Sequence, residues 1–214
     1  MRPLALFGGT FDPIHIGHLS VAWEAAELLE AEVRLMPANV PPHRAPPTAT
    51  ATQRVDMLRA ALRGQSRLAL DTRELDRSGP SYTIDTLGEF RREFGERPLV
   101  LLLGADAFAG LRSWHRWRDL LDLTHIGVIN RPGVDACIPV ELERAVAARR
   151  TDDPAVIGAQ SAGRVIELAV TPLEVSATRI RELLAQGRDP RYLLPAGLFD
   201  DPALLAPYRD AAPV

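Results

Sequence analysis

Gly8-Gly9-Thr10-Phe11-Asp12-Pro13-Ile14-His15-Ile16-Gly17-His18 is the most informative stretch of the chain. The apolar run Pro3–Phe7 precedes it and predicts a buried strand, and Gly17–Glu30 follows it with the apolar spacing of a helix. Two glycines directly after a strand let the backbone approach a ligand closely, because no side chain intervenes. The amides and positive dipole end of the following helix point toward the same place. The stretch therefore predicts an anion-binding site at the end of the first strand.

Two histidines of this stretch add side-chain donors to the predicted site. His15 and His18 lie three residues apart, which places both imidazoles on one face of a helical turn, and Thr10 adds a hydroxyl. Such donors suit the charge that spreads over a phosphoryl-transfer transition state. A metal site is the competing interpretation, but only Asp12 stands nearby as a third ligand. We therefore expect a phosphate site with no protein-bound metal.

Short apolar runs alternate with amphipathic stretches along the rest of the chain. This alternation predicts a Rossmann-like α/β fold, with a mostly parallel sheet, helices on both faces and a small helical C-terminal region. Ligands of such sheets bind beyond the carboxyl ends of the strands, so the motifs that follow strands are expected at that edge. The predicted strands are Pro3–Phe7, Glu32–Met36, Leu68–Leu70, Leu99–Leu103, Thr124–Ile129 and Val165–Val170, and the predicted helices are Gly17–Glu30, Thr52–Leu62, Tyr82–Phe94 and Ser176–Ala185.

Length and composition indicate one globular domain. We expect it to span residues 1–205 of the 214, with residues 206–214 as a flexible tail and Ala45–Ala51 as a mobile loop. The formal net charge of −3 argues against binding to nucleic acid or membranes through overall charge. No apolar run approaches the ~20 residues of a membrane-spanning helix. The single cysteine cannot form an internal disulfide, which fits a cytoplasmic protein.

The chain contains no lysine, so all 25 of its basic residues are arginines. This excludes Schiff-base chemistry through lysine, a lysyl-nucleotide intermediate and a Walker-type phosphate loop. It also excludes class I aminoacyl-tRNA synthetases, which share the His15-Ile16-Gly17-His18 pattern but pair it with a lysine-bearing second loop. Phosphate must be bound here by arginine, histidine, hydroxyls and backbone amides.

A second candidate phosphate site opens the last predicted long helix. Ser176 stands at the N-cap position, where its hydroxyl and the first helix amides can bind phosphate oxygens. Thr178 adds a hydroxyl, and Arg181 can stabilise charge on the β- and γ-phosphates of a nucleotide. This pattern and the H-x-G-H stretch together resemble the two motifs of the nucleotidylyltransferase superfamily. The resemblance implies that this superfamily's fold is present, that ATP is bound by Gly8, Gly9, Thr10, Phe11, His15, His18, Asp106, Ser176, Thr178 and Arg181, and that His15, His18, Thr10 and Arg181 are catalytic.

Segments between these two sites narrow the resemblance to bacterial nicotinate-nucleotide adenylyltransferases. Pro37–Arg44 resembles the family's P-x-x-x-P-P-H-[KR] loop, and Ser81–Leu87 its S-Y-T-x-x-T-L segment. Leu103–Asp106, Trp114–Trp117 and Asn130–Gly133 resemble its G-x-D turn, tryptophan segment and R-P-G turn. The matches follow the family's order along most of the chain.

The resemblance implies transfer of AMP from ATP to nicotinate mononucleotide by direct in-line attack, with Mg²⁺ carried by ATP and no covalent intermediate. Trp114 can offer an aromatic face to the pyridine ring. Main-chain amides near Thr83 and His115 would hold the acceptor carboxylate, although the family often has tyrosine where His115 stands. Asp106 would orient ribose hydroxyls or the metal-bound nucleotide. The implied mononucleotide-binding residues are Asn39, His43, Thr83, Trp114, His115 and Arg131.

Other functions stay open from the sequence. The same chemistry could act on nicotinamide mononucleotide or phosphopantetheine, or the chain could be a catalytically silent, nucleotide-binding regulatory protein. A redox-type dinucleotide-binding domain would need G-x-G-x-x-G after the first strand, where this chain has Gly8-Gly9-Thr10.

Overall fold

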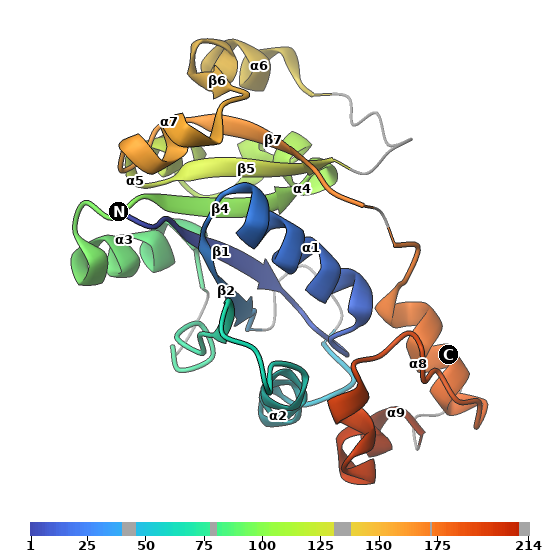
Figure 1. Cartoon of the computed structure of the whole chain (residues 1–214). Coiled ribbons are helices and arrows are strands. Elements are labelled where there is room, and N and C mark those ends of the chain that lie inside the picture. Colours follow the sequence, from blue (N-terminus) through green and yellow to red (C-terminus); the bar gives the residue numbers. More distant parts are fainter. Residues whose placement is uncertain (40–45, 78–80, 131–137, 172, 210–214) are drawn as a thin grey trace.

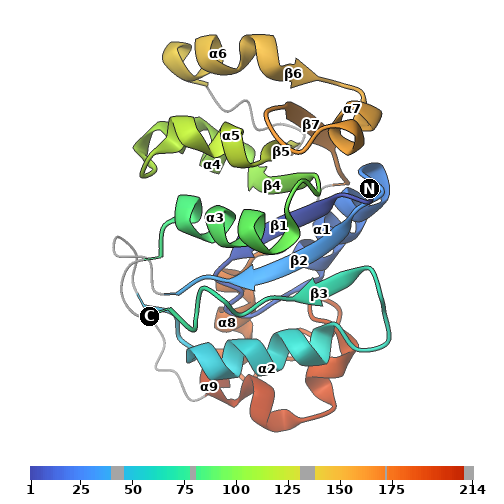
Figure 2. The ribbon, with the colours of Figure 1, turned by 90° about the vertical axis from the view of Figure 1, so that its left-hand side faces the viewer.

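The computed structural model describes residues 1–39, 46–77, 81–130, 138–171 and 173–209. Its centre is a seven-stranded sheet in the order β3-β2-β1-β4-β5-β7-β6, in which all the paired strands are parallel (Figures 1 and 2). The predicted parallel α/β architecture is confirmed. The strands are β1 (Leu4–Gly9), β2 (Glu32–Pro37), β3 (Leu68–Leu70), β4 (Leu99–Gly104), β5 (His125–Asn130), β6 (Arg150–Thr151) and β7 (Val165–Ala169).

Helices cover both faces of the sheet, and a cluster of buried side chains lies under each set. Side chains of β1 point alternately to the two faces of the sheet, so Ala5 belongs to one cluster and Leu4 and Leu6 belong to the other. In Figure 1, α1 crosses in front of the sheet. The cluster of Ala5 includes residues of α1 (Ile16–Leu28), α2 (Ala51–Ala61), α7 (Pro154–Ala159), α8 (Ala177–Ala185) and α9 (Ala206–Arg209), and that of Leu4 includes residues of α3 (Thr83–Phe94), α4 (Ala105–Ala109), α5 (Leu120–Leu123) and α6 (Val140–Val146).

The two segments that were predicted to be mobile are partly anchored. Residues 206–209 form α9, and Tyr208 is fully buried, so the predicted tail begins too early. Burial of Tyr208 stabilises an ordered conformation in this proline-containing segment, because one aromatic side chain removes a large apolar surface from water. In the predicted loop, Ala49 is buried and Ala51 already begins α2. Residues 40–45 and 210–214 lie outside the described residues.

In the part of the chain that the structure describes, no helix combines the length and the apolar character needed to cross a bilayer.

Candidate active site

The predicted motifs meet at the edge formed by the carboxyl ends of the strands. β1 ends at Gly9 and β4 at Gly104, and the amide of Ala38, just after β2, donates to the carbonyl of Gly9 over 2.9 Å. The strand order reverses between β1 and β4, which is where open α/β sheets bind ligands. Asn39 follows β2 and Asp106 follows β4, so both stand at this edge, as predicted.

The two histidines of the N-terminal stretch form a stacked pair at the start of α1. Their ring centroids are 3.6 Å apart with an angle of 23° between the planes. His15 is the N-cap of the helix, and its Nδ1 accepts from the amide of His18 over 3.3 Å. The Nδ1 of His18 accepts in return from the amide of His15 over 3.4 Å. Each ring therefore carries its proton on Nε2 in the neutral form, because a nitrogen that accepts a hydrogen bond bears no proton.

Phe11 supports the histidine pair from the protein side. It is buried, has a φ of 51°, and meets the His18 ring edge to face at a centroid distance of 5.1 Å. A side chain at Gly9 would collide with it, since an added Cβ would lie 2.9 Å from the Phe11 ring. The ring of Phe11, a residue predicted to bind ATP, thus lies in the core.

Arg54 is a buried cation beneath the glycine turn that was not predicted from the sequence. It is 1% exposed, and its Nη1 donates to the carbonyls of Thr10 (2.7 Å) and Ala38 (3.0 Å). The guanidinium therefore joins the ends of β1 and β2. The sequence could have indicated that Arg54 is buried, because it shares a helical face with the buried Met57 and Leu58 of α2.

The C-terminal motif lies against the N-terminal one. Ser176 is the N-cap of α8, as predicted, and its hydroxyl accepts from the amide of Arg179 over 3.2 Å. Arg181 donates through Nη1 to the main-chain carbonyl of Asp12 over 2.7 Å and through Nη2 to Thr178 Oγ1 over 3.3 Å. Two segments that are far apart in the sequence thus form one site, with hydroxyls and a guanidinium beside the histidine pair.

The segments predicted to bind the acceptor also come together. The rings of Tyr82 and His115 lie 4.6 Å apart, which brings the start of α3 at Thr83 next to the tryptophan segment. Trp114 is partly buried against the core, which leaves part of its surface open, whereas Trp117 is buried.

A polar network holds the segment that leads into α3. Arg77 donates through Nη1 to Ser81 Oγ (2.9 Å) and to Thr86 Oγ1 (3.2 Å), and it forms an ion pair with Glu89 at 2.7 Å. Thr86 donates in turn to Glu74, and burial raises the pKa of the Glu74 carboxyl. Ser81 and Thr86 of the S-Y-T-x-x-T-L segment therefore contact protein groups and fix the start of α3.

Two of the residues predicted to bind the mononucleotide are not described, and a further histidine, His125, lies in the core. His43 and Arg131 lie outside the described residues. His125 is fully buried in β5, where its Nδ1 accepts from the amide of Arg164 and its Nε2 bonds to the carbonyl of Gln160. Burial lowers the pKa of His125. These contacts are those of a structural histidine, as expected from its place in a strand.

A small cavity of about 100 Å³ lies beside the histidine pair. Apart from the histidines, its walls are glycine and apolar side chains. A planar and weakly polar group would fit such a recess better than a charged one. The cavity is lined by Phe7, His15, Gly17, His18, Val21, Gly104, Ile129, Val170, Leu173 and Val175.

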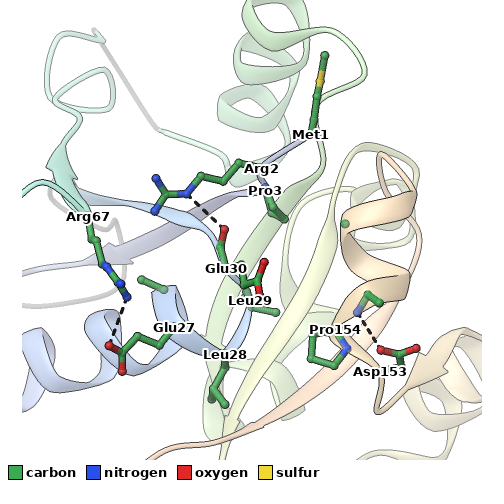
Figure 3. A pocket seen from close by; sticks show the side chains of 13 residues that line it. Met1, Arg2, Pro3, Glu27, Leu28, Leu29, Glu30, Arg67, Asp153 and Pro154 are labelled. Atoms are coloured by element: carbon green, nitrogen blue, oxygen red, sulfur yellow. Dashed lines mark hydrogen bonds and ion pairs between the residues drawn. The ribbon is translucent and has the colours of Figure 1, made fainter.

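A larger and more open hollow, of about 1150 Å³, lies away from this site (Figure 3). It is lined by the residues that precede β1, the end of α1 and the start of α7. Its two arginines are engaged, because Arg2 donates to the carbonyl of Glu30 and Arg67 pairs with Glu27 (Figure 3). None of the predicted site residues lines it, so volume alone does not locate the chemistry.

Within the described ranges, no three His, Cys, Asp or Glu side chains group closely enough to hold a metal ion. The donors at the site are imidazoles, hydroxyls, a guanidinium and amides, which suit phosphate oxygens more than a cation.

The fold and these two motifs define a nucleotidyltransferase of the cytidylyltransferase-like family, which matches residues 6–183. Two curated relatives are called "Probable nicotinate-nucleotide adenylyltransferase". The protein from Dechloromonas aromatica is 48% identical over 93% of this chain and 94% of its own length, and that from Pseudomonas syringae pv. tomato is 50% identical over 91% and 88%. The chain belongs to the nicotinate-nucleotide adenylyltransferase family.

A solved structure of the nicotinic acid mononucleotide adenylyltransferase of Plasmodium falciparum, complexed with NaAD, shares the fold. Its TM-score is 0.71 at 15% identity, with 98% of this chain and 97% of that one covered.

Proposed function

We propose that this chain transfers AMP from ATP to nicotinate mononucleotide and releases nicotinate adenine dinucleotide and pyrophosphate, a step of NAD biosynthesis. The observation that carries the proposal is the 2.7 Å contact between Arg181 and the carbonyl of Asp12, which joins the two phosphate-binding motifs. It places Arg181 next to the turn that precedes α1, so that a triphosphate can contact both.

The reaction needs no general base, because a phosphate monoester is already an anionic nucleophile at neutral pH. A mononucleotide phosphate oxygen attacks the α-phosphorus of ATP, and the bond from that phosphorus to the β-phosphate oxygen breaks in line with it. His15 and His18 donate from Nε2 to the phosphate oxygens, whose charge shifts in the transition state. Arg181 neutralises the departing pyrophosphate. Mg²⁺, carried by the triphosphate, supplies further positive charge.

The surroundings of the histidine pair support an orientation for bound ATP. The small apolar cavity takes the adenine base, and Asp106, exposed at the start of α4, accepts from ribose hydroxyls. In this arrangement the hydroxyls of Thr10 and Thr178 bind the triphosphate. This assignment directs the α-phosphorus to the histidine pair.

The acceptor binds at the same edge of the sheet, between the start of α3 and the tryptophan segment. Trp114 presents its open surface to the pyridine ring, and amides near Thr83 and His115 bind the nicotinate carboxylate. Uncharged amide donors favour a carboxylate over a carboxamide, because a carboxamide places a donor N–H of its own against one of them. The polar network around Arg77 holds the start of α3, and with it the amide near Thr83, in position.

The proposed function is tested by measuring pyrophosphate release from ATP and Mg²⁺ with three acceptors in parallel. We expect turnover with nicotinate mononucleotide, at least about tenfold less with nicotinamide mononucleotide, and none with phosphopantetheine; one lost hydrogen bond, with its amide donor left unpaired, accounts for a difference of that order between the first two. Preference for another acceptor would overturn the acceptor assignment. No release with any acceptor would instead support a silent nucleotide-binding protein.

Gly17→Ala is expected to lower turnover about tenfold, because it displaces the histidine pair. An added Cβ at this position would lie 3.1 Å from Nδ1 and 3.2 Å from Cε1 of His15, so the imidazole must shift. Gly158→Ala in α7 is the matched control, since a Cβ there meets no atom within 4 Å. Steady-state turnover at saturating ATP, with a thermal unfolding curve for each variant, checks this. Equal turnover of the two variants would contradict it.

A further inference from the structure

Asp12 is a buried carboxylate that accepts hydrogen bonds from two distant parts of the chain. It is 6% exposed. Its Oδ1 accepts from the Tyr208 hydroxyl (2.8 Å) and the Ala49 amide (2.9 Å), and its Oδ2 accepts from the Thr48 amide (2.8 Å). The N-terminal motif is thereby joined to the segment before α2 and to α9 at the end of the described chain.

Arg181 contacts Asp12 mainly through the main chain. Its Nη1 is 2.7 Å from the carbonyl oxygen of Asp12 but 3.9 Å from the carboxylate oxygen Oδ2. In a hydrogen-bonded ion pair the nitrogen and oxygen atoms are about 2.7–2.9 Å apart, so Arg181 and the Asp12 carboxylate do not form a direct hydrogen bond. The amides and the tyrosine hydroxyl already occupy lone pairs of the carboxylate. They leave the guanidinium at the rim of the site, where its side chain is 31% exposed.

We propose that Asp12 and Tyr208 together are a positioning device, which holds Arg181 directed at the triphosphate and makes α9 a necessary part of the active site. The proposal rests on the function proposed above, in which Arg181 binds the phosphates of ATP. Tyr208 does not contact the substrate; it acts through the carboxylate and then through the guanidinium.

The direction of the effect follows from competition for one carboxylate. The Tyr208 hydroxyl stays protonated and donating, since burial and the neighbouring Asp12 raise its pKa. Without that donor, Oδ1 keeps only the Ala49 amide and attracts the Arg181 guanidinium more strongly. The guanidinium then turns inward and closes the ion pair, and the triphosphate loses a cation.

Tyr208→Phe keeps the buried ring and removes only the hydroxyl, and Tyr192→Phe is its matched control because Tyr192 is 86% exposed. Both substitutions are made alone and with Arg181→Ala. Two quantities are measured for each protein: kcat/KM for ATP, and the affinity for ATP with Mg²⁺ by calorimetry. Thermal unfolding of every variant confirms that it is folded.

We expect Tyr208→Phe to weaken both quantities about tenfold when Arg181 is present, and to change neither when Arg181 is alanine. Tyr192→Phe should change neither in either background. Equal losses with and without Arg181 would show that Tyr208 has only a structural role and would overturn the proposal. So would an Arg181→Ala variant with unchanged ATP affinity. The calorimetric comparison of the variants uses no acceptor, so it can be interpreted even if the acceptor is not nicotinate mononucleotide.

Discussion

His18→Ala is expected to lower turnover by about 10²- to 10³-fold, while the affinity for ATP changes by less than about threefold. The size of the loss is that of removing one preorganised donor that meets charge as it develops in a transition state. ATP affinity changes little, because many other groups contribute to ground-state binding. Single-turnover rates and calorimetric binding of ATP separate the two effects. Unchanged turnover would contradict the role of His18.

The cap that His18 forms can be separated from its chemistry with a second variant. The Nδ1 of His18 accepts from the amide of His15, and the Oδ1 of asparagine lies in a comparable place, whereas asparagine has nothing where Nε2 stands. His18→Asn should therefore keep the start of α1 and its stability but lose turnover as severely as His18→Ala. Recovery of turnover in His18→Asn would show that the cap, and not the donor, matters.

Arg54→Met is expected to lower the free energy of unfolding by about 2–4 kcal/mol, because it leaves the buried carbonyls of Thr10 and Ala38 without their donor. Burial lowers the pKa of Arg54 while the Asp12 carboxylate opposes that shift, so the cation also balances a nearby negative charge. Its Nε has no partner among the described residues, and removal of that donor offsets part of the loss.

Arg59→Met in the same helix is the control for this prediction. The Arg59 side chain is 65% exposed and pairs with the exposed Asp56, so the change should be within about 0.5 kcal/mol. Urea unfolding of both variants, compared at equal slopes, gives the two free energies. A loss for Arg54→Met no greater than that for Arg59→Met would contradict a structural role for the buried cation.

Local patterns in the sequence predicted most of the fold. The apolar run Leu99–Leu103 became the buried strand β4, and the predicted helix Ser176–Ala185 differs from α8 by one residue, its N-cap. These elements are encoded locally, because apolar periodicity and capping residues act over one or two turns. β6 has only two residues and no periodicity, so its place beside β7 could not be predicted.

In the site, too, features that depend on neighbouring residues could be predicted and the others could not. The histidine pair and the N-cap Ser176 were predicted, because His15 with His18 and Ser176 with its helix lie within a few residues of each other. The orientation of the Phe11 ring could not be predicted, since its left-handed backbone and the absence of a side chain at Gly9 let it turn into the core.

The contacts of Asp12 depend on how distant segments pack. Its partners Arg181 and Tyr208 are 169 and 196 residues away, and Arg54 reaches Thr10 across 44. A buried carboxylate or carbonyl requires a donor, but no local pattern says which donor supplies it. That choice follows from the positions that α2, α8 and α9 take against the sheet once the core has formed.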